Sequence, residues 1–449
     1  MEEVITTYDF VLLPVYLGIF YLIVRRKSRK YEQLGLRKTF IIAFWLRMVG
    51  AIGYGCLIQY YYGYGDSFGY YNGGNVLIEM IQQDITSIKY LFASGKEIVA
   101  AAKLMGLKEI IPESMPNDSN AFIMKICALL SVFTFNKYLI ISVCFGFFSF
   151  IGIWKLFYFF YQMNDRKNVK LLVFLILYFP SLWFWGSGLL KEPVCVGALG
   201  IIFYLFYKNF IVKKFSVKDI GVVLLMLLII TIVKSYISGL LLLSFSVVLI
   251  YKAFGLIKVL IFRVITVLLV TMVTIAVLIN LDLSGPIKSF VETSFKQIEI
   301  FQKSYQSVQE MEEIGSKAGF NLSGLNPTVE SIVANSPAVI GTCLFRPFVW
   351  EAKKVIIFFA SLEAMFTLLF LLYILWKTKI VFFFIYLVNS GLLLFCFIFS
   401  ILLALVIGYT TFNFGTLVRY KIIFLPFLYF LFVNIYTLST KKKVRVNNL

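Results

Sequence analysis

The sequence contains no histidine, and charged residues supply only 14% of its 449 positions. Without histidine the chain cannot build a Ser-His-Asp triad, a histidine general base or the usual histidine-containing zinc and haem sites. Any catalysis must therefore rely on carboxylates, lysine, arginine or tyrosine. Because charged residues make up about 25% of a typical soluble domain, the low charged fraction also excludes an ordinary soluble protein.

Cysteine and nucleotide-binding motifs are equally sparse. The six cysteines form no CxxC pair and mostly lie in apolar runs, which is typical of small core residues. The GxxxxGK[ST] loop that cradles ATP phosphates is absent. Energy for a reaction or a transport step would then come from an activated substrate, a gradient or a partner. Carboxylates are available for Mg²⁺ or Mn²⁺, but their spacing does not demand a metal, so the sequence assigns no cofactor.

Hydrophobic residues, in contrast, supply 60% of the chain and aromatic residues 18%, with a mean hydropathy of +0.89. A membrane-spanning helix needs roughly 20 apolar residues, and apolar runs recur from end to end. We therefore expect an all-α, polytopic integral membrane protein with about eleven transmembrane helices in one domain, residues 1–449. Several runs are short enough to be re-entrant instead. The expected helices cover about residues 8–24, 39–62, 138–162, 171–185, 194–207, 220–233, 240–251, 259–280, 355–376, 381–407 and 422–438.

The basic segment RRKSRKYEQLGLRK, residues 25–38, sets the expected orientation, since lysine and arginine concentrate in cytoplasmic loops. This places the N-terminus outside, the C-terminal KKKVR tail inside, and residues 63–137 and 281–350 in two outer loops. The first loop contains amphipathic stretches, about residues 76–93 and 121–135, that we expect along the membrane interface. The acidic start, MEEV, favours a retained first helix over a secretory signal.

The net charge of +19 follows from this topology. Short loops assigned to the inside carry about half of the 42 lysines and arginines, with few acids among them. The basic excess therefore marks cytoplasmic loops, and it gives no reason to expect a nucleic-acid partner.

The stretch YYYGYGDSFGYYNGGN, residues 60–75, places one carboxylate, Asp66, at the edge of a strongly apolar segment. Ionisable groups at membrane depth are costly and usually functional. The tyrosines around Asp66 suit a sugar face, although an aromatic belt followed by a turn is the simpler alternative. We interpret Asp66 as a catalytic candidate, a general base or metal ligand acting on an acceptor hydroxyl, with Tyr70 and Tyr71 as substrate-binding candidates.

The predicted topology gathers the unusual charged residues of short, apolar-flanked segments on the outer face. Cations are disfavoured in short outer loops, so a group of them there suggests an anion site. Arginine binds phosphate in a bidentate manner and lysine supplies a point charge. The turn GSGLLKEP, residues 186–193, adds a helix N-terminus whose N–H groups also favour an anion. The substrate-binding candidates are Lys191, Glu192, Lys234, Arg346, Trp350, Glu351, Arg419 and Lys421.

Four of these candidates also have a structural explanation. Lys191 with Glu192 would make a local ion pair, and Arg346 and Arg419 would be interfacial side chains that extend to water. The functional interpretation depends on the shared face of the cations rather than on any one of them.

An acidic residue followed by tyrosine just after an early transmembrane helix, as in GDSFGYY, residues 65–71, resembles the first outer loop of the GT-C superfamily of glycosyltransferases. The many-helix layout, large late outer loop and outer arginines are similar to bacterial O-antigen and exopolysaccharide polymerases. Asp66, Arg346 and Arg419 carry this likeness. Two features depart from it: an extra helix precedes the Asp66 loop, and the histidine expected in the large loop of O-antigen ligases is absent.

The resemblance implies a membrane glycosyltransferase, of hexosyltransferase type, or a polysaccharide polymerase. Its substrate would be a sugar linked to polyprenyl phosphate or pyrophosphate, used at the non-cytoplasmic face of the bacterial inner (plasma) membrane. The expected partners are therefore membrane lipid and the lipid-linked sugar.

Two other functions fit the same residues. A transporter or flippase of lipid-linked oligosaccharide would use the cations during passage, but it should show an internal repeat with helices broken near the midplane, and the sequence shows no convincing repeat. A non-catalytic subunit of an envelope or secretion complex would use the two outer loops to hold envelope-assembly partner proteins.

Overall fold

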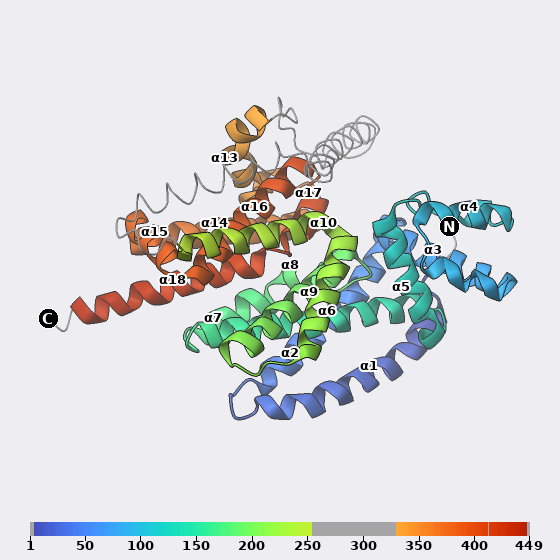
Figure 1. Cartoon of the computed structure of the whole chain (residues 1–449), viewed down its shortest axis with the longest axis horizontal. Coiled ribbons are helices and arrows are strands. Elements are labelled where there is room, and N and C mark those ends of the chain that lie inside the picture. Colours follow the sequence, from blue (N-terminus) through green and yellow to red (C-terminus); the bar gives the residue numbers. More distant parts are fainter. Residues whose placement is uncertain (1–3, 254–328, 412, 447–449) are drawn as a thin grey trace. The chain divides into compact units, whose positions relative to one another are not determined.

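The computed structural model describes residues 4–253, 329–411 and 413–446, which form helices and no strand. The predicted all-α fold is confirmed for these residues (Figure 1). The predicted helix 259–280 and most of the predicted outer loop 281–350 lie outside them. The described helices divide into two compact units, Met1–Ser238 and Gly239–Leu449.

Helix α6 is the centre of the first unit and packs against α9 and α2. A Cβ at Gly152 of α6 would lie 2.2 Å from the carbonyl oxygen of Gly197 in α9. Small residues let membrane helices approach this closely and pack by van der Waals contact. The long helices of this unit are α1 (Thr7–Ser28), α2 (Arg37–Leu57, continued by a π-helical turn Ile58–Tyr62), α6 (Tyr138–Met163) and α9 (Lys191–Phe206, continued by Tyr207–Ile211).

The N-terminal ends of α1 and α6 lie side by side. Asp9 is fully buried, and its carboxylate accepts hydrogen bonds from the backbone N–H groups of Thr6 at 2.9 Å and Leu139 at 2.9 Å. The two helices therefore begin on the same side of the unit, as the predicted topology requires.

Short helices fill the segment between α2 and α6, namely α3 (Asp66–Gln83), α4 (Gly95–Leu104) and α5 (Asp118–Thr134). Helix α3 packs against α5 at Gly74, where a Cβ would meet the Cβ of Cys127 at 2.9 Å. The turns are held by exposed side-chain caps. Hydrogen bonds from Thr86 lower the pKa of Asp84, and hydrogen bonds from Ser94 lower the pKa of Glu97. The caps satisfy N–H groups that a helix start leaves without intrahelical partners.

At two places the observed helices differ from the predicted ones. The predicted helix 171–185 consists of short pieces, α7 (Val169–Val173), a π-helical turn Phe174–Tyr178 and α8 (Pro180–Phe184), because Pro180 cannot continue a helix that precedes it. The predicted helices 220–233 and 240–251 belong to one element, α10 (Val217–Ala253), broken at Lys234, where φ is −151° and ψ is 83°.

The second unit contains aromatic helix contacts around α16 and α18. Phe399 packs 5.5 Å from Phe395 and 5.0 Å from Phe427, measured between ring centroids. The predicted helix 381–407 is divided between α15 and α16. The elements of this unit are α13 (Val329–Phe345), α14 (Val355–Thr378), α15 (Ile380–Asn389), α16 (Gly391–Thr410), α17 (Phe414–Lys421) and α18 (Leu425–Val446).

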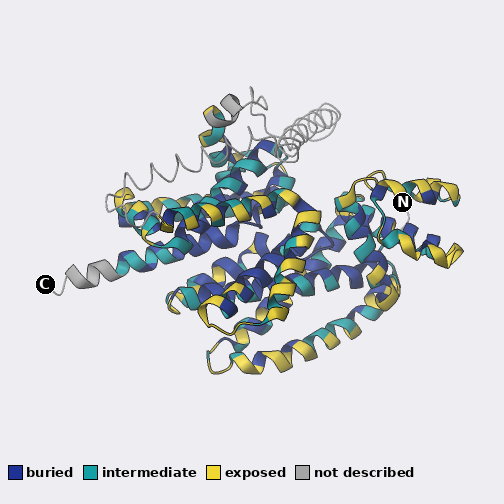
Figure 2. Cartoon of the chain, in the orientation of Figure 1, coloured by how far each residue is buried: buried dark blue, intermediate teal, exposed yellow. Residues whose placement is uncertain are grey.

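Within the described residues, seven helices are long and apolar enough to cross a membrane, or up to eight if the bent pair α17 and α18 forms one span. Their outward faces carry exposed apolar side chains, as on α1, where Val11 is 65% exposed and Leu22 is 62% exposed (Figure 2). Lipid tails are as apolar as these side chains, so such surfaces are stable in a bilayer, whereas exposing them to water would cost free energy. The chain is therefore a multi-pass membrane protein, while the predicted count of eleven helices is not confirmed.

Candidate functional site

The first unit brings Asp66 and Lys191 to one place. Asp66 is exposed and opens α3, where an acidic residue in the first turn interacts favourably with the helix dipole. Lys191 opens α9, and its ammonium group donates a 2.5 Å hydrogen bond to Ser119 Oγ at the start of α5. Asp66 is near enough to Lys191 for the two charges to interact. Three helix N-termini, those of α3, α5 and α9, thus contribute side chains to one polar cluster.

The start of α9 offers more than the lysine. Leu190 is its N-cap residue, and no side chain caps the first N–H groups. Uncapped N–H groups and the positive end of the helix dipole attract anions. The Lys191 ammonium group also lies 6.0 Å from the centre of the Tyr70 ring, which is buried. Cation, N–H donors and aromatic surface therefore occur together at this helix end.

A buried ion pair lies beside this cluster. The Lys234 ammonium group donates a 2.7 Å hydrogen bond to Glu192 Oε1, and the two side chains are only 7% and 1% exposed. Lys234 is the residue at which α10 is broken, and Glu192 lies in the first turn of α9. A buried charge is costly unless it is paired, so the pair fixes the break in α10 against the start of α9.

The turn before Lys191 is clamped to α2 by a buried arginine. Arg47 is 1% exposed, and its Nη1 donates hydrogen bonds to the Gly186 carbonyl at 2.5 Å and to Ser149 Oγ at 2.9 Å. Gly186 has no room for a side chain, since a Cβ would lie 2.2 Å from Arg47 Nη1. A Cβ at Gly188 would similarly meet the Tyr54 ring at 2.3 Å. The glycines of this turn permit close packing, and that packing sets the position of Lys191.

Tyr71 has a structural partner. Its hydroxyl donates a 2.8 Å hydrogen bond to the Asn136 carbonyl, which joins α3 to the turn between α5 and α6. Burial raises the pKa of the Tyr71 phenol, with a smaller opposing effect from the side chain of Asn75. The phenol therefore stays protonated at neutral pH and acts as a donor.

The second unit holds the other predicted residues around Arg346. Its Nε and Nη2 both donate to the Glu351 carboxylate, with Nε to Oε2 at 3.1 Å, and the two side chains are 21% and 18% exposed. Burial raises the pKa of Glu351, but hydrogen bonds from Arg346 and the Phe348 N–H outweigh it and hold the pKa below its ordinary value. Lys421, which is buried, donates to the Arg346 carbonyl at 2.5 Å.

Trp350 and Arg419 complete the predicted set in this unit. Trp350 is 81% exposed and stacks on Phe348 with ring centroids 4.8 Å apart. The Arg419 guanidinium group lies 5.2 Å from the centre of the neighbouring Tyr420 ring. The Trp350 side chain is thus largely exposed, while the Arg346 guanidinium group is paired with Glu351.

The predicted residues thus fall into two groups. Asp66, Tyr70, Tyr71, Lys191, Glu192 and Lys234 belong to the first unit, and Arg346, Trp350, Glu351, Arg419 and Lys421 belong to the second. Ser119 and Arg47 were missed by the sequence reasoning. A lone arginine inside an apolar helix is a signal in its own right, whereas nothing in the sequence around Ser119 indicates a contact with Lys191, which lies 72 positions away.

Among the described residues, no three or more of the cysteine, aspartate and glutamate side chains lie close enough together to hold a metal ion.

No protein-family model matches the chain, and no curated protein and no solved structure matches it either.

Proposed function

We propose that this chain is a membrane glycosyltransferase or polysaccharide polymerase whose donor is a sugar linked to polyprenyl phosphate or pyrophosphate. The observation that carries the proposal is the cluster at the start of α9, where Lys191, uncapped N–H groups and the Tyr70 ring lie beside the Asp66 carboxylate. The first three suit a phosphate joined to an apolar tail, and the carboxylate suits an acceptor hydroxyl.

In the proposed reaction Asp66 accepts the proton of the acceptor hydroxyl as that oxygen bonds to the anomeric carbon. The bond from the anomeric carbon to the lipid phosphate oxygen breaks, and the phosphate leaves with the electron pair. The Lys191 ammonium group and the α9 N–H groups stabilise the charge that develops on this phosphate. Glu192 and Lys234 hold the start of α9 in place.

We also propose that the second unit contributes to substrate binding through Arg346, Trp350, Glu351, Arg419 and Lys421. Because Arg346 is already paired with Glu351, we expect its contribution to be smaller than that of Lys191. The proposed reaction takes place at the non-cytoplasmic face of a bacterial inner membrane, with the N-terminus outside and the C-terminus inside.

The test is transfer of labelled sugar from a polyprenyl-linked donor into polymer by membranes containing the full chain. We expect Asp66→Asn to reduce transfer by about 100-fold or more, as loss of a general base does. Glu79→Gln is the matched control, because Glu79 is an exposed carboxylate of the same helix, α3. Full activity in Asp66→Asn would remove Asp66 from the mechanism.

Transport of lipid-linked oligosaccharide is the second candidate, and one observation favours it. The apolar helix α10 is broken at Lys234, and the break carries a buried ion pair. Broken helices with charged groups are typical of transporters. Purified protein in vesicles separates the two functions: a transporter moves labelled lipid-linked sugar between leaflets with its glycosidic bond intact, whereas a transferase releases polyprenyl phosphate or pyrophosphate.

A further inference from the structure

A second polar cluster lies at the other end of α9. This helix begins at Lys191 and continues as a π-helical turn that contains Lys208. At 1.5 Å per residue the two lysines lie about 25 Å apart along the axis, close to the thickness of a bilayer core. The far cluster is therefore distinct from the site proposed for the lipid-linked sugar.

Lysines from three segments of the chain meet there. Lys155 of α6 interacts electrostatically with Lys27 at the end of α1, with Lys30 just after it and with Lys208. Asp219, at the start of α10, is the one carboxylate in the same set. Lys155 thus lies within electrostatic range of three other ammonium groups and one carboxylate.

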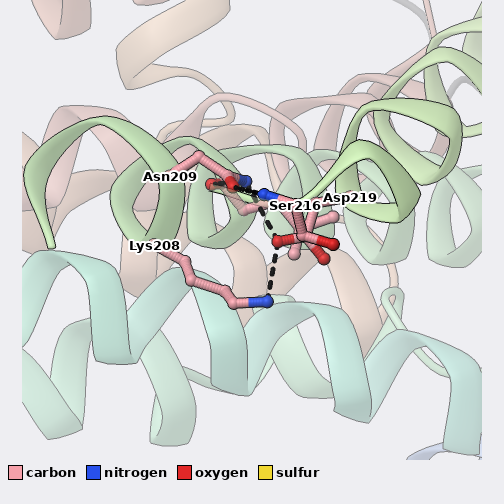
Figure 3. Close-up of polar contacts among 5 residues, drawn as sticks. Lys208, Asn209, Ser216 and Asp219 are labelled. Atoms are coloured by element: carbon pink, nitrogen blue, oxygen red, sulfur yellow. Dashed lines mark hydrogen bonds and ion pairs between the residues drawn. The ribbon is translucent and has the colours of Figure 1, made fainter. Parts of the chain in front are cut away.

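That carboxylate is already engaged. Asp219 Oδ2 accepts hydrogen bonds from Lys208 Nζ at 2.7 Å and from Asn209 Nδ2 at 3.1 Å (Figure 3). The turn is closed by the Ser216 N–H, which donates to Asn209 Oδ1 at 3.0 Å. Asp219 therefore ties α9 to α10 and compensates Lys208, which leaves the positive charges of Lys27, Lys30 and Lys155 in excess.

Lys155 is the unusual member of the cluster. It lies eight residues before α6 ends at Met163, about 12 Å inside the helix end. It is half-buried, and its ammonium group lies 5.3 Å from the centre of the Tyr204 ring. A lysine within a membrane span is costly and usually has a binding role, so extension of a surface lysine to water does not explain it.

Aromatic rings line the same place. Tyr158 lies 5.9 Å from Tyr31 and 6.2 Å from Tyr204, between ring centroids, and the Lys30 ammonium group lies 4.8 Å from the Tyr31 ring. Tyrosine rings prefer the boundary between headgroups and acyl chains. The combination of excess lysine with tyrosine at a helix end suits a phosphate that is attached to a lipid.

We propose that Lys155, Lys27 and Lys30 bind the phosphate of an anionic phospholipid headgroup in the leaflet next to the basic 25–38 segment. Basic pockets between transmembrane helices on the cytoplasmic side bind such headgroups. The bound phosphate compensates the lysines and holds the end of α1 against α6 and α9.

The test compares lipid binding by the purified full chain, measured by native mass spectrometry with phosphatidylglycerol and phosphatidylcholine. We expect phosphatidylglycerol to bind about 10-fold more tightly, and Lys155→Gln to remove most of this preference while Lys155→Arg retains it. Lys38→Gln is the control, because Lys38 is exposed and belongs to the same basic segment but not to the cluster. Equal loss in Lys38→Gln, or none in Lys155→Gln, overturns the proposal.

Two further binding measurements distinguish a lipid phosphate from a soluble phosphate compound, and the Lys155 cluster from the site at Lys191. Glycerol phosphate without a lipid tail should bind at least 10-fold more weakly than phosphatidylglycerol; equal binding would identify a soluble phosphate compound and overturn the lipid assignment. Binding of polyprenyl pyrophosphate at the Lys191 end should stay within about twofold in Lys155→Gln. A parallel loss there would show that the two ends of α9 form one site.

Discussion

The two ion pairs at the predicted site residues differ in burial and in sequence separation. Glu192 and Lys234 are 42 positions apart, come from two membrane-spanning elements and are almost fully buried. Arg346 and Glu351 are five positions apart, lie in one loop and keep about a fifth of each side chain exposed. The first pair fixes how helices meet, while the second fixes the shape of a turn.

Similar charges in similar sequence contexts therefore have different roles in this protein. Burial makes an ion pair costly to break, because the remaining partner keeps an uncompensated charge. A pair that keeps contact with solvent is partly screened and contributes less. The Glu192–Lys234 pair is therefore the stronger link to the proposed site, since it holds the start of α9.

Breaking the buried pair should have the largest effect. Lys234→Met leaves Glu192 buried without its partner and should lower the free energy of unfolding by about 3–5 kcal/mol. The double variant Glu192→Gln with Lys234→Met should recover most of this loss, because no buried charge remains. Unfolding in mixed micelles measures both. Equal losses in the single and double variants would contradict the account.

Disturbing the turn that supports the buried pair should have a smaller effect. In Gly186→Ala the added Cβ would meet Arg47 Nη1 at 2.2 Å and the Leu182 carbonyl at 2.3 Å. We expect a loss of about 1–3 kcal/mol in the same unfolding measurement, the usual range for overpacking. Gly221→Ala is the control, since nothing lies within 4 Å of its Cβ position. It should be neutral or stabilising, and a similar loss there would exclude the packing explanation.

The less buried pair, Arg346 with Glu351, should give the smallest effect, and this effect should depend on pH. Arg346→Ala should cost about 1 kcal/mol or less at neutral pH. The lowered pKa of Glu351 adds stability above its ordinary value of 4.5, and this stability is lost as pH falls through the lowered pKa. The difference in unfolding free energy between the natural chain and Glu351→Gln should therefore shrink in acid. A difference in unfolding free energy that grows in acid would contradict this prediction.

The sequence predicts where the helices lie along the chain better than it predicts which helices pack together. Apolar runs locate α6 and α14 within two residues of their observed ends, because the bilayer demands a fixed apolar length. The short pieces α7 and α8 were missed, since a run broken by proline has the same composition as a continuous one. The ion pair between Arg346 and Glu351 was not predicted, although the two residues are only five positions apart.

Long-range contacts could not be predicted in this way. A local ion pair between Glu192 and Lys191 was the structural alternative, but Glu192 pairs with Lys234, and Lys191 contacts Ser119. Apolar periodicity identifies the lipid-facing and core-facing sides of a helix, but it does not specify which helix lies alongside. The electrostatic interaction of Asp66 with Lys191 therefore could not be predicted from the sequence alone.

The most direct test of the central claim is a cryo-EM structure of the full chain in lipid with polyprenyl pyrophosphate bound. We predict phosphate density within hydrogen-bond distance of Lys191 Nζ and the first N–H groups of α9, with the Asp66 carboxylate facing the same space. Phosphate bound elsewhere, with the Lys191–Ser119 contact intact, would contradict the proposed site.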